Sequence, residues 1–224
     1  MKMSSWIAAG AAALATSAAL AAPVTIDFDT DGLGNPLAAG TIITNQYANL
    51  GVLVSANNNN ASHPDLAIIF NSASPTGGDT DLRTPGPGIG NNTPLGKILI
   101  IAENAVDTSP ADGRIDVPDD EEAGGWIRFD HSFLATEVSL TLVDIEEHGG
   151  IIRFFLNNVP VATQPIPALG DNSVQTINKL LPQTPFNAIR VDLAGSGAIG
   201  AITIVPEPAS LGLLLLGAAL FRRR

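Results

Sequence analysis

The chain has 224 residues, which suits one well-buried domain, and 45% of its residues are hydrophobic. Its 22 acidic and 11 basic residues give a formal net charge of −11 at pH 7, which argues against nucleic acid as a partner. There is no cysteine, so disulfides and a thiol nucleophile are excluded, and the fold must be held by its core, or by its core and a metal.

The first 21 residues have the three parts of a secretory signal peptide. A lysine supplies a positive start, residues 6–22 contain no charge, and Ala19 and Ala21 form a small-x-small cleavage pattern. A buried alanine-rich helix is the alternative, but its few hydroxyl side chains would hardly give it a polar face. We therefore expect a signal helix over 1–21, export through Sec-type machinery, and a mature chain that begins near residue 22.

Residues 22–204 show the period-two alternation of half-buried antiparallel strands. Apolar and polar side chains alternate in VTIDFD (24–29), TEVSLTL (136–142) and AIRVDL (188–193). Glycine, proline, asparagine and aspartate separate these segments, and the region has no convincing long amphipathic helix. We therefore predict an all-β domain, a single antiparallel β-sandwich or jelly roll.

Other segments of this region also predict strands. LAIIF (66–70) and KILIIA (97–102) are continuously apolar, as central strands covered on both faces can be. Residues 151–167 predict a hairpin that turns at Asn157-Asn158, because asparagine tolerates a positive φ. Further strands are expected over 51–56, 125–133, 173–180 and 197–205.

An acidic segment near the start of the predicted domain imitates part of a calcium loop. Asp27, Asp29 and Asp31 alternate ahead of Gly32, as at the start of an EF-hand, but position twelve is Ala38 where a bidentate glutamate is required. The three carboxylates could still donate oxygens to a calcium ion that another loop completes. The alternative is an ordinary strand end whose outward residues are acidic.

Two long loops, 71–95 and 103–125, carry further acidic candidates. Asp79 and Asp81 are two apart between glycines and prolines, where they could bind one hard cation or belong to a solvated turn. Residues 110–125 hold six acidic residues against one arginine, which favours a mobile solvated loop. Between residues 22 and 205 there are seven basic and 21 acidic residues, a net charge of −14, and calcium is the cofactor that this acidity predicts.

One tryptophan is predicted to lie beside charged side chains on the outer face of a strand. In GWIRFDHSF the alternation places apolar side chains on one face and Trp126, Arg128 and Asp130 on the other. A ring beside such donors and acceptors can stack on a sugar while they bond its hydroxyls, which predicts a glycan site. By the same alternation Phe155 shares a face with Arg153. The alternative is that a second sheet or a loop covers this face.

Catalytic motifs are scarce in this sequence. The three histidines lack zinc-type spacing, and no Gly-x-Ser-x-Gly elbow occurs. Asp144, Glu146, Glu147 and His148 fall at one strand end, where two carboxylates could serve a glycosidase, although a charged strand end is the favoured interpretation. We predict a protein that is not an enzyme.

The last twenty residues combine an extended motif, a short apolar stretch and a basic end. A helix over 209–221 would be about 20 Å long, whereas a bilayer core is about 30 Å thick. The prolines hold Glu207 on an extended, accessible peptide, and the final arginines resist translocation. In order, the three parts are Val205-Pro206-Glu207-Pro208, residues 209–221, and Arg222, Arg223 and Arg224.

This order resembles the PEP-CTERM sorting signal of Gram-negative bacteria, over residues 205–224 only. The resemblance implies cleavage near the Pro-Glu-Pro by an exosortase, with transient attachment to the inner membrane and then a place on the cell surface or in the extracellular matrix. The family is associated with bacteria that secrete exopolysaccharide and form biofilm or floc. An ordinary short tail anchor is the alternative, but it has no need of the proline pair.

We therefore expect an exported protein with a signal peptide (1–21), a β-sandwich (22–204) and a sorting signal (205–224) that includes a short apolar helix. Its predicted role is to bind or organise exopolysaccharide without catalysis, with calcium stabilising its loops. A hydrolase or lyase that degrades matrix polysaccharide is one alternative, and a purely structural matrix protein is another.

Overall fold

The computed structural model describes residues 22–146 and 149–208. The predicted signal helix with Ala19 and Ala21, the apolar segment 209–221 and the three terminal arginines lie outside the described residues, as do Glu147 and His148. Within the described ranges, no helix is long and apolar enough to cross a membrane.

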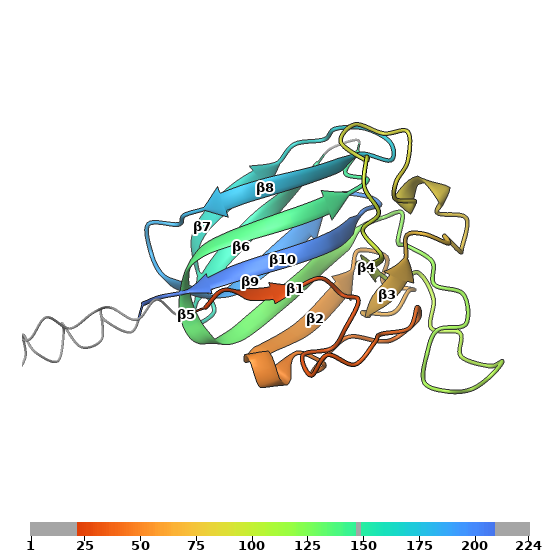
Figure 1. The fold of residues 1–224 in the computed structure, drawn as a ribbon, viewed down its shortest axis with the longest axis horizontal. Coiled ribbons are helices and arrows are strands. Elements are labelled where there is room, and N and C mark those ends of the chain that lie inside the picture. The colour runs from red at the N-terminus through yellow and green to blue at the C-terminus, as the bar shows by residue number, and fades with distance from the viewer. Residues whose placement is uncertain (1–21, 147–148, 209–224) are drawn as a thin grey trace, which may run out of the picture. The chain divides into compact units, whose positions relative to one another are not determined.

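Strands dominate the described residues, with two short 3-10 helices between them (Figure 1). The helices are η1 (Ala48–Leu50) and η2 (Thr80–Leu82). The strands are β1 (Val24–Ile26), β2 (Val52–Asn58), β3 (Ala67–Asn71), β4 (Lys97–Ile101), β5 (Gly125–Val143), β6 (Gly150–Leu156), β7 (Val159–Ile166), β8 (Val174–Leu180), β9 (Phe186–Leu193) and β10 (Ala198–Pro206).

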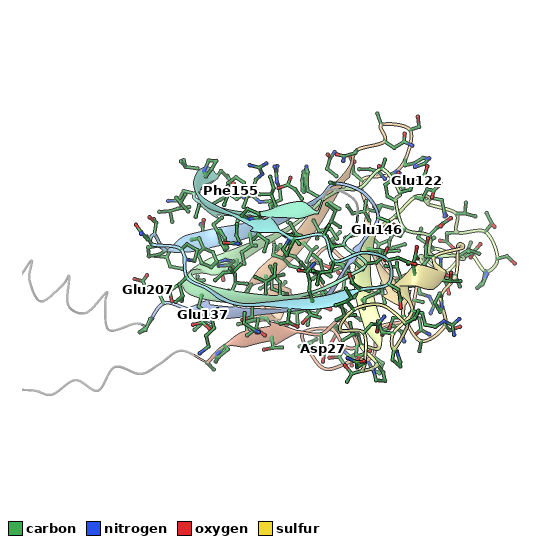
Figure 2. The ribbon with its side chains drawn as sticks, turned by 90° about the horizontal axis from the view of Figure 1, so that it is seen from above. Asp27, Glu122, Glu137, Glu146, Phe155 and Glu207 are labelled. Atoms are coloured by element: carbon green, nitrogen blue, oxygen red, sulfur yellow. The ribbon has the colours of Figure 1, made fainter. Side chains whose placement is uncertain are left out.

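The strands form two layers that share β5. Residues 125–130 of β5 pair with β2 on one side and β9 on the other, and this layer continues through β6 to β7. Residues 138–143 of β5 pair with β8 and β10 instead, and β10 also pairs with β1 and β4. All of these pairs are antiparallel, and Figure 2 shows the layers with side chains between them. The predicted all-β sandwich is confirmed.

Two segments that the sequence suggests as separate strands are one. Residues 125–133 and 136–142 both belong to the 19-residue β5. The residues between them contain no glycine or proline, so the backbone stays extended. The pairing with β9 shifts register between Asp130 and Ala135, where β5 leaves one layer for the other.

The main core lies between the two layers. Its largest fully buried side chains include Phe28, Phe129, Phe154 and Phe186, and the rings of Phe154 and Phe186 meet edge to face with centroids 5.0 Å apart. Burial of such apolar surface is the main favourable contribution to folding, about 25 cal/mol per Å². Without disulfides, this core carries most of the stability of the domain.

A second apolar cluster lies on the other face of β3 and β4. Ile69 and Leu99 point into the main core, whereas Ile68 and Ile100 point into the second cluster. Leu82 and Ile115, from the two long loops, are buried in this cluster with them. The continuous apolar character of these strands is therefore explained, because loops cover the face that a solvated sheet would expose.

The predicted hairpin at Asn157-Asn158 is confirmed. Strands β6 and β7 pair on either side of this two-residue turn, with φ of 51° at Asn157 and 67° at Asn158. Two positive φ values in a row match the twist of the flanking strands, and asparagine adopts them at low cost.

The last described residues belong to the sandwich. Val205 and Pro206 pair with β5, and the backbone N–H of Glu207 donates to the carbonyl of Leu134 over 2.7 Å. The compact unit therefore runs from Ala22 to Glu207, beyond the expected boundary at 204. Strand β10 ends at Pro206, and Glu207, which was expected on an accessible peptide, is bonded to the sheet.

We expect Leu82→Ala to lower the free energy of unfolding by about 3 kcal/mol, because Leu82 is fully buried under the 71–95 loop and its removal leaves a cavity. Leu33→Ala is the control, since Leu33 is 76% exposed and its loss should change stability by less than about 0.5 kcal/mol. Urea unfolding measures both, and equal values would show that the loop does not pack on the sheet.

Candidate functional site

The outer face of the layer that contains β2, β5, β9, β6 and β7 gathers the predicted glycan residues. Ile127 and Phe129 are fully buried in the core, whereas Trp126, Arg128 and Asp130 alternate with them on the other side and are half-buried. The alternation predicted from the sequence is therefore confirmed. We call this surface the arginine face, and it comprises Trp126, Arg128, Asp130, Arg153, Phe155, Arg190 and Asp192.

Three arginines lie in one row across the arginine face. Arg190 of β9 is directly opposite Arg128 of β5 on one side and Arg153 of β6 on the other. Neighbouring strands are about 4.8 Å apart, so the row is about 10 Å long. Like charges directly opposite each other destabilise a sheet, so the row needs compensating groups.

Two aspartates supply that compensation. Asp192 accepts from Nε of Arg153 at 2.8 Å and pairs with a terminal nitrogen of Arg190 at 2.8 Å, so one carboxylate serves two guanidinium groups. Asp130 accepts from Nε of Arg128 at 3.0 Å and from a terminal nitrogen at 2.7 Å. With three cations and two anions, the face keeps one net positive charge.

Aromatic rings lie against the same guanidinium groups. The guanidinium carbon of Arg128 is 4.8 Å from the centroid of the Phe155 ring, and that of Arg190 is 5.4 Å from the Trp126 ring. Cation–π contacts at these distances hold the two guanidinium groups against the rings. Phe155 is buried, at 7% exposed, so Trp126 is the half-buried ring that lies beside the dense set of donors.

The β6–β7 turn contributes a neutral group to the arginine face. A terminal nitrogen of Arg128 donates to the side-chain oxygen of Asn158 over 2.5 Å. The sequence predicts Asn158 for its turn geometry alone, and no motif in it marks Arg190 or Asp192 as site residues. The alternation in AIRVDL already places those two side chains outward, but only the strand order shows which neighbours they meet.

An apolar hollow of about 400 Å³ adjoins the arginine face at Asp130. Leu53, which is 52% exposed, lies opposite Asp130 on β2 and lines this hollow. An exposed leucine beside a row of donors extends the surface on which an amphipathic ligand could lie.

The first predicted calcium segment uses its carboxylates within the protein. Oδ1 of Asp27 accepts from the backbone of Asp29, whose own Oδ1 accepts from the backbone N–H of Lys97. Asp31 accepts from Leu33 and Asn35 in a tight turn. The structure does not bring these three aspartates together as a metal site; they organise the turn after β1.

Asp79 and Asp81, predicted as one pair, join different groups. Asp79 accepts from the backbone N–H of Asp120 at 2.8 Å. Asp81 meets Asp144 and Asp171, with one carboxylate oxygen of each within 4.8 Å of the others. Over residues 22–146 and 149–208, this is the group of three acidic side chains that could hold a metal ion.

Asn172 holds the three segments of this acidic cluster in place. Its backbone N–H donates to Oδ1 of Asp144 at 2.6 Å, and its side-chain amide donates to the backbone carbonyls of Asp81 and Arg83. The cluster borders an open hollow of about 470 Å³. Neither Asp171 nor Asn172 follows a metal motif in the sequence, so only the fold reveals the cluster.

Burial shifts the titration of the carboxyl groups around this end of the sandwich. Burial, with repulsion from Asp81 and its neighbours, raises the pKa of Asp144 to about 6. Burial likewise raises the pKa of Asp79 to about 7, with Asp119 adding repulsion. Asp120 is also buried, its pKa is raised, and it accepts from the Ser196 hydroxyl at 2.7 Å. A divalent cation would relieve this repulsion.

The residues considered for a glycosidase are only partly described. Asp144 is fully buried and bonded to Asn172, and Glu146 lines the hollow beside the acidic cluster. Glu147 and His148 lie outside the described residues. A polysaccharide hydrolase or lyase stays an alternative that rests on the sequence alone.

Comparisons with known proteins show partial likenesses. No family model matches the chain, and no curated protein matches it by sequence. A fucose-binding module of Streptococcus pneumoniae has 17% identity and a TM-score of 0.29, over 39% of this chain and 69% of its own. Discoidin II of Dictyostelium discoideum has 16% identity and a TM-score of 0.35, over 78% of this chain and 61% of its own. Allantoicase of Saccharomyces cerevisiae has 11% identity and a TM-score of 0.34, over 74% of this chain and 43% of its own. Likenesses this distant carry no argument about a ligand or a reaction.

We expect calcium to raise the unfolding midpoint of the protein and EDTA to reverse the rise. Asp171→Asn should abolish most of the effect, because it removes one carboxylate of the acidic cluster. Asp27→Asn, in the other predicted calcium segment, is the matched control and should respond as the wild type does. Loss of the calcium response in the Asp27 variant alone would place the ion in that first segment.

In EDTA, we expect the unfolding midpoint to fall between about pH 4 and pH 7 because of Asp79 and Asp144. Each carboxyl has a higher pKa in the folded than in the unfolded chain. The stability that is fully present below the unfolded pKa of about 4 is therefore lost as pH rises to the folded values of about 6 and about 7. Asp79→Asn should flatten this fall.

The buried His131 acts in the opposite direction, since burial lowers its pKa and favours folding as pH rises. The test is therefore the difference in unfolding midpoint between the wild type and Asp79→Asn at each pH. Asp112→Asn is the control, because Arg114 holds the pKa of that exposed carboxyl below its usual value. Identical pH profiles for the wild type and the Asp79 variant would contradict the prediction.

Proposed function

We propose that this is an exported cell-surface or matrix protein that binds exopolysaccharide through its arginine face without catalysing a reaction. The observation that carries the proposal is the half-buried Trp126 ring, which lies against Arg190 on the same outer sheet surface as Arg128 and Arg153. Sugars are bound by flat apolar surface that stacks on the ring, together with fixed polar groups that bond its hydroxyls.

The proposed location rests on the two terminal signals of the sequence. The signal pattern supports export, and the motif around Glu207 supports sorting by an exosortase. Val24, at the start of β1, pairs with Ile204 near the end of β10, so the two ends of the folded unit are neighbours. An enzyme acting beyond Glu207 would leave the sandwich and its arginine face complete.

Retention on immobilised bacterial exopolysaccharide tests the proposal. The unit Ala22–Glu207 is suitable because it contains every strand and both apolar clusters of the described residues. We expect retention of the wild type and about tenfold weaker binding of Trp126→Ala, since stacking on an indole contributes on the order of 1 kcal/mol or more.

Ile89→Ala is the matched control, because Ile89 is 65% exposed on the 71–95 loop, away from the arginine face. Running the column with calcium and then with EDTA shows whether a cation takes part in retention. Absence of retention in both buffers would contradict the glycan role and favour a structural matrix protein.

A further inference from the structure

We propose that the arginine face selects acidic polysaccharides, with sugar carboxylates as the groups that its arginines bind. This inference rests on the proposed function and narrows its ligand from glycans in general to uronate-bearing polymers. It comes from the charge, the unused donors and the spacing of the arginine row.

The first argument is the uneven distribution of charge. Residues 22–205 contain seven basic and 21 acidic residues, and the arginine face holds three of the basic and two of the acidic ones. The side chains that flank the row on β2 and β7, Ser55 and Thr163, are neutral. Asp65 approaches the edge of the layer and accepts from Asn57 at 3.0 Å. A surface with a local positive charge is unexpected on so acidic a domain unless it serves an anion.

The second argument is the supply of unused donors. Within the described chain, Arg153 donates to Asp192 through Nε alone, so its two terminal amino groups are free to bond a ligand. Its side chain is 35% exposed, and that of Arg190 is 27% exposed, so both guanidinium groups are reachable. A guanidinium has five N–H donors in a planar fork that matches a carboxylate.

The third argument is that the face already binds carboxylates in this way. Asp192 is held between Arg153 and Arg190, and Asp130 lies against Nε and a terminal nitrogen of Arg128. The cation–π contacts fix the orientation of Arg128 and Arg190, so a ligand carboxylate meets preorganised donors. Neutral hydroxyls would leave the one net positive charge of the face uncompensated.

The spacing of the row favours a polymer over a single sugar. The three guanidinium groups cross about 10 Å of sheet, so a chain with repeated carboxylates can engage more than one of them at once. The net charge of −14 over residues 22–205 opposes the approach of a polyanion. At about 0.15 M salt the Debye length is about 8 Å, so contacts at the face outweigh repulsion from distant acids.

Binding of polygalacturonate, with fully methyl-esterified polygalacturonate as the neutral partner, tests the inference. Measurements use the unit Ala22–Glu207 in EDTA and about 0.15 M salt, so that calcium cannot bridge protein and polymer. We expect the free acid to bind at least about tenfold more tightly than the ester, because hydrogen bonds between charged groups are the stronger ones.

Arg153→Gln should weaken binding of the free acid about tenfold and binding of the ester by a clearly smaller factor. Arg114→Gln removes the same charge from an exposed arginine in the 103–125 loop and should change neither. Unfolding midpoints of both variants, measured in parallel, separate loss of binding from loss of fold. Arg153→Lys keeps the charge but not the fork, so it should recover only part of the affinity.

Three outcomes would overturn the inference. One is equal affinity for the acid and the ester, with both affinities lowered by Trp126→Ala. That result would support glycan binding but would show that the sugar carboxylate is not recognised. Another is an equal loss of affinity for the free acid in Arg114→Gln and Arg153→Gln, which would show that binding depends only on the net charge of the protein. The third is equally tight binding of dextran sulfate, which would assign the face to anions in general. Failure to bind any of these polymers or the exopolysaccharide would instead defeat the proposed function itself.

Discussion

The fold depends on the continuous hydrogen bonding of β5, the one strand that belongs to both layers. Its first half pairs with β2 and β9, and its second half pairs with β8 and β10. Because side chains alternate along an extended backbone, this pairing also sets the two faces. Ile127 and Phe129 point into the core, and the residues that alternate with them point to the outer surface. The main core and the arginine face therefore lie on opposite sides of the layer that contains the first half of β5.

The long loops pack against the sandwich and carry much of its buried charge. Leu82 and Ile115 seal the second apolar cluster, while Asp120 and Asp144 are buried close to the same end of the molecule. Burying a carboxyl group is costly unless it is protonated, hydrogen-bonded or neutralised by a cation. The hydrogen bonds from Asn172 and Ser196 supply part of that compensation. Loop packing and titration are therefore linked at this end, whereas the arginine face lies on the outer surface of one sheet.

Local patterns predicted much of this architecture. Period-two alternation located β1, β5 and β9, continuous apolar runs located β3 and β4, and the asparagine pair located the β6–β7 turn. All three signals depend on neighbours in the sequence. The same alternation put Trp126, Arg128 and Asp130 on one face. The predicted metal ligands did not group as the sequence suggested. Asp27, Asp29 and Asp31 accept hydrogen bonds that organise the turn after β1, and Asp79 and Asp81 lie in different groups of side chains. Spacing along a loop does not determine where its carboxylates point, since loop conformation depends on what the loop packs against.

By itself, the sequence determined an acidic, disulfide-free β-domain and, for the strands with alternating side chains, the side that faces solvent. Only the tertiary structure decided that Arg190 lies between Arg128 and Arg153, and that Asp144 meets Asp81 and Asp171. The physical reason is that strand order and register come from pairing between segments far apart in the chain, selected by how their buried faces pack together. Alternation fixes which way a side chain points, and the packed fold fixes what it meets.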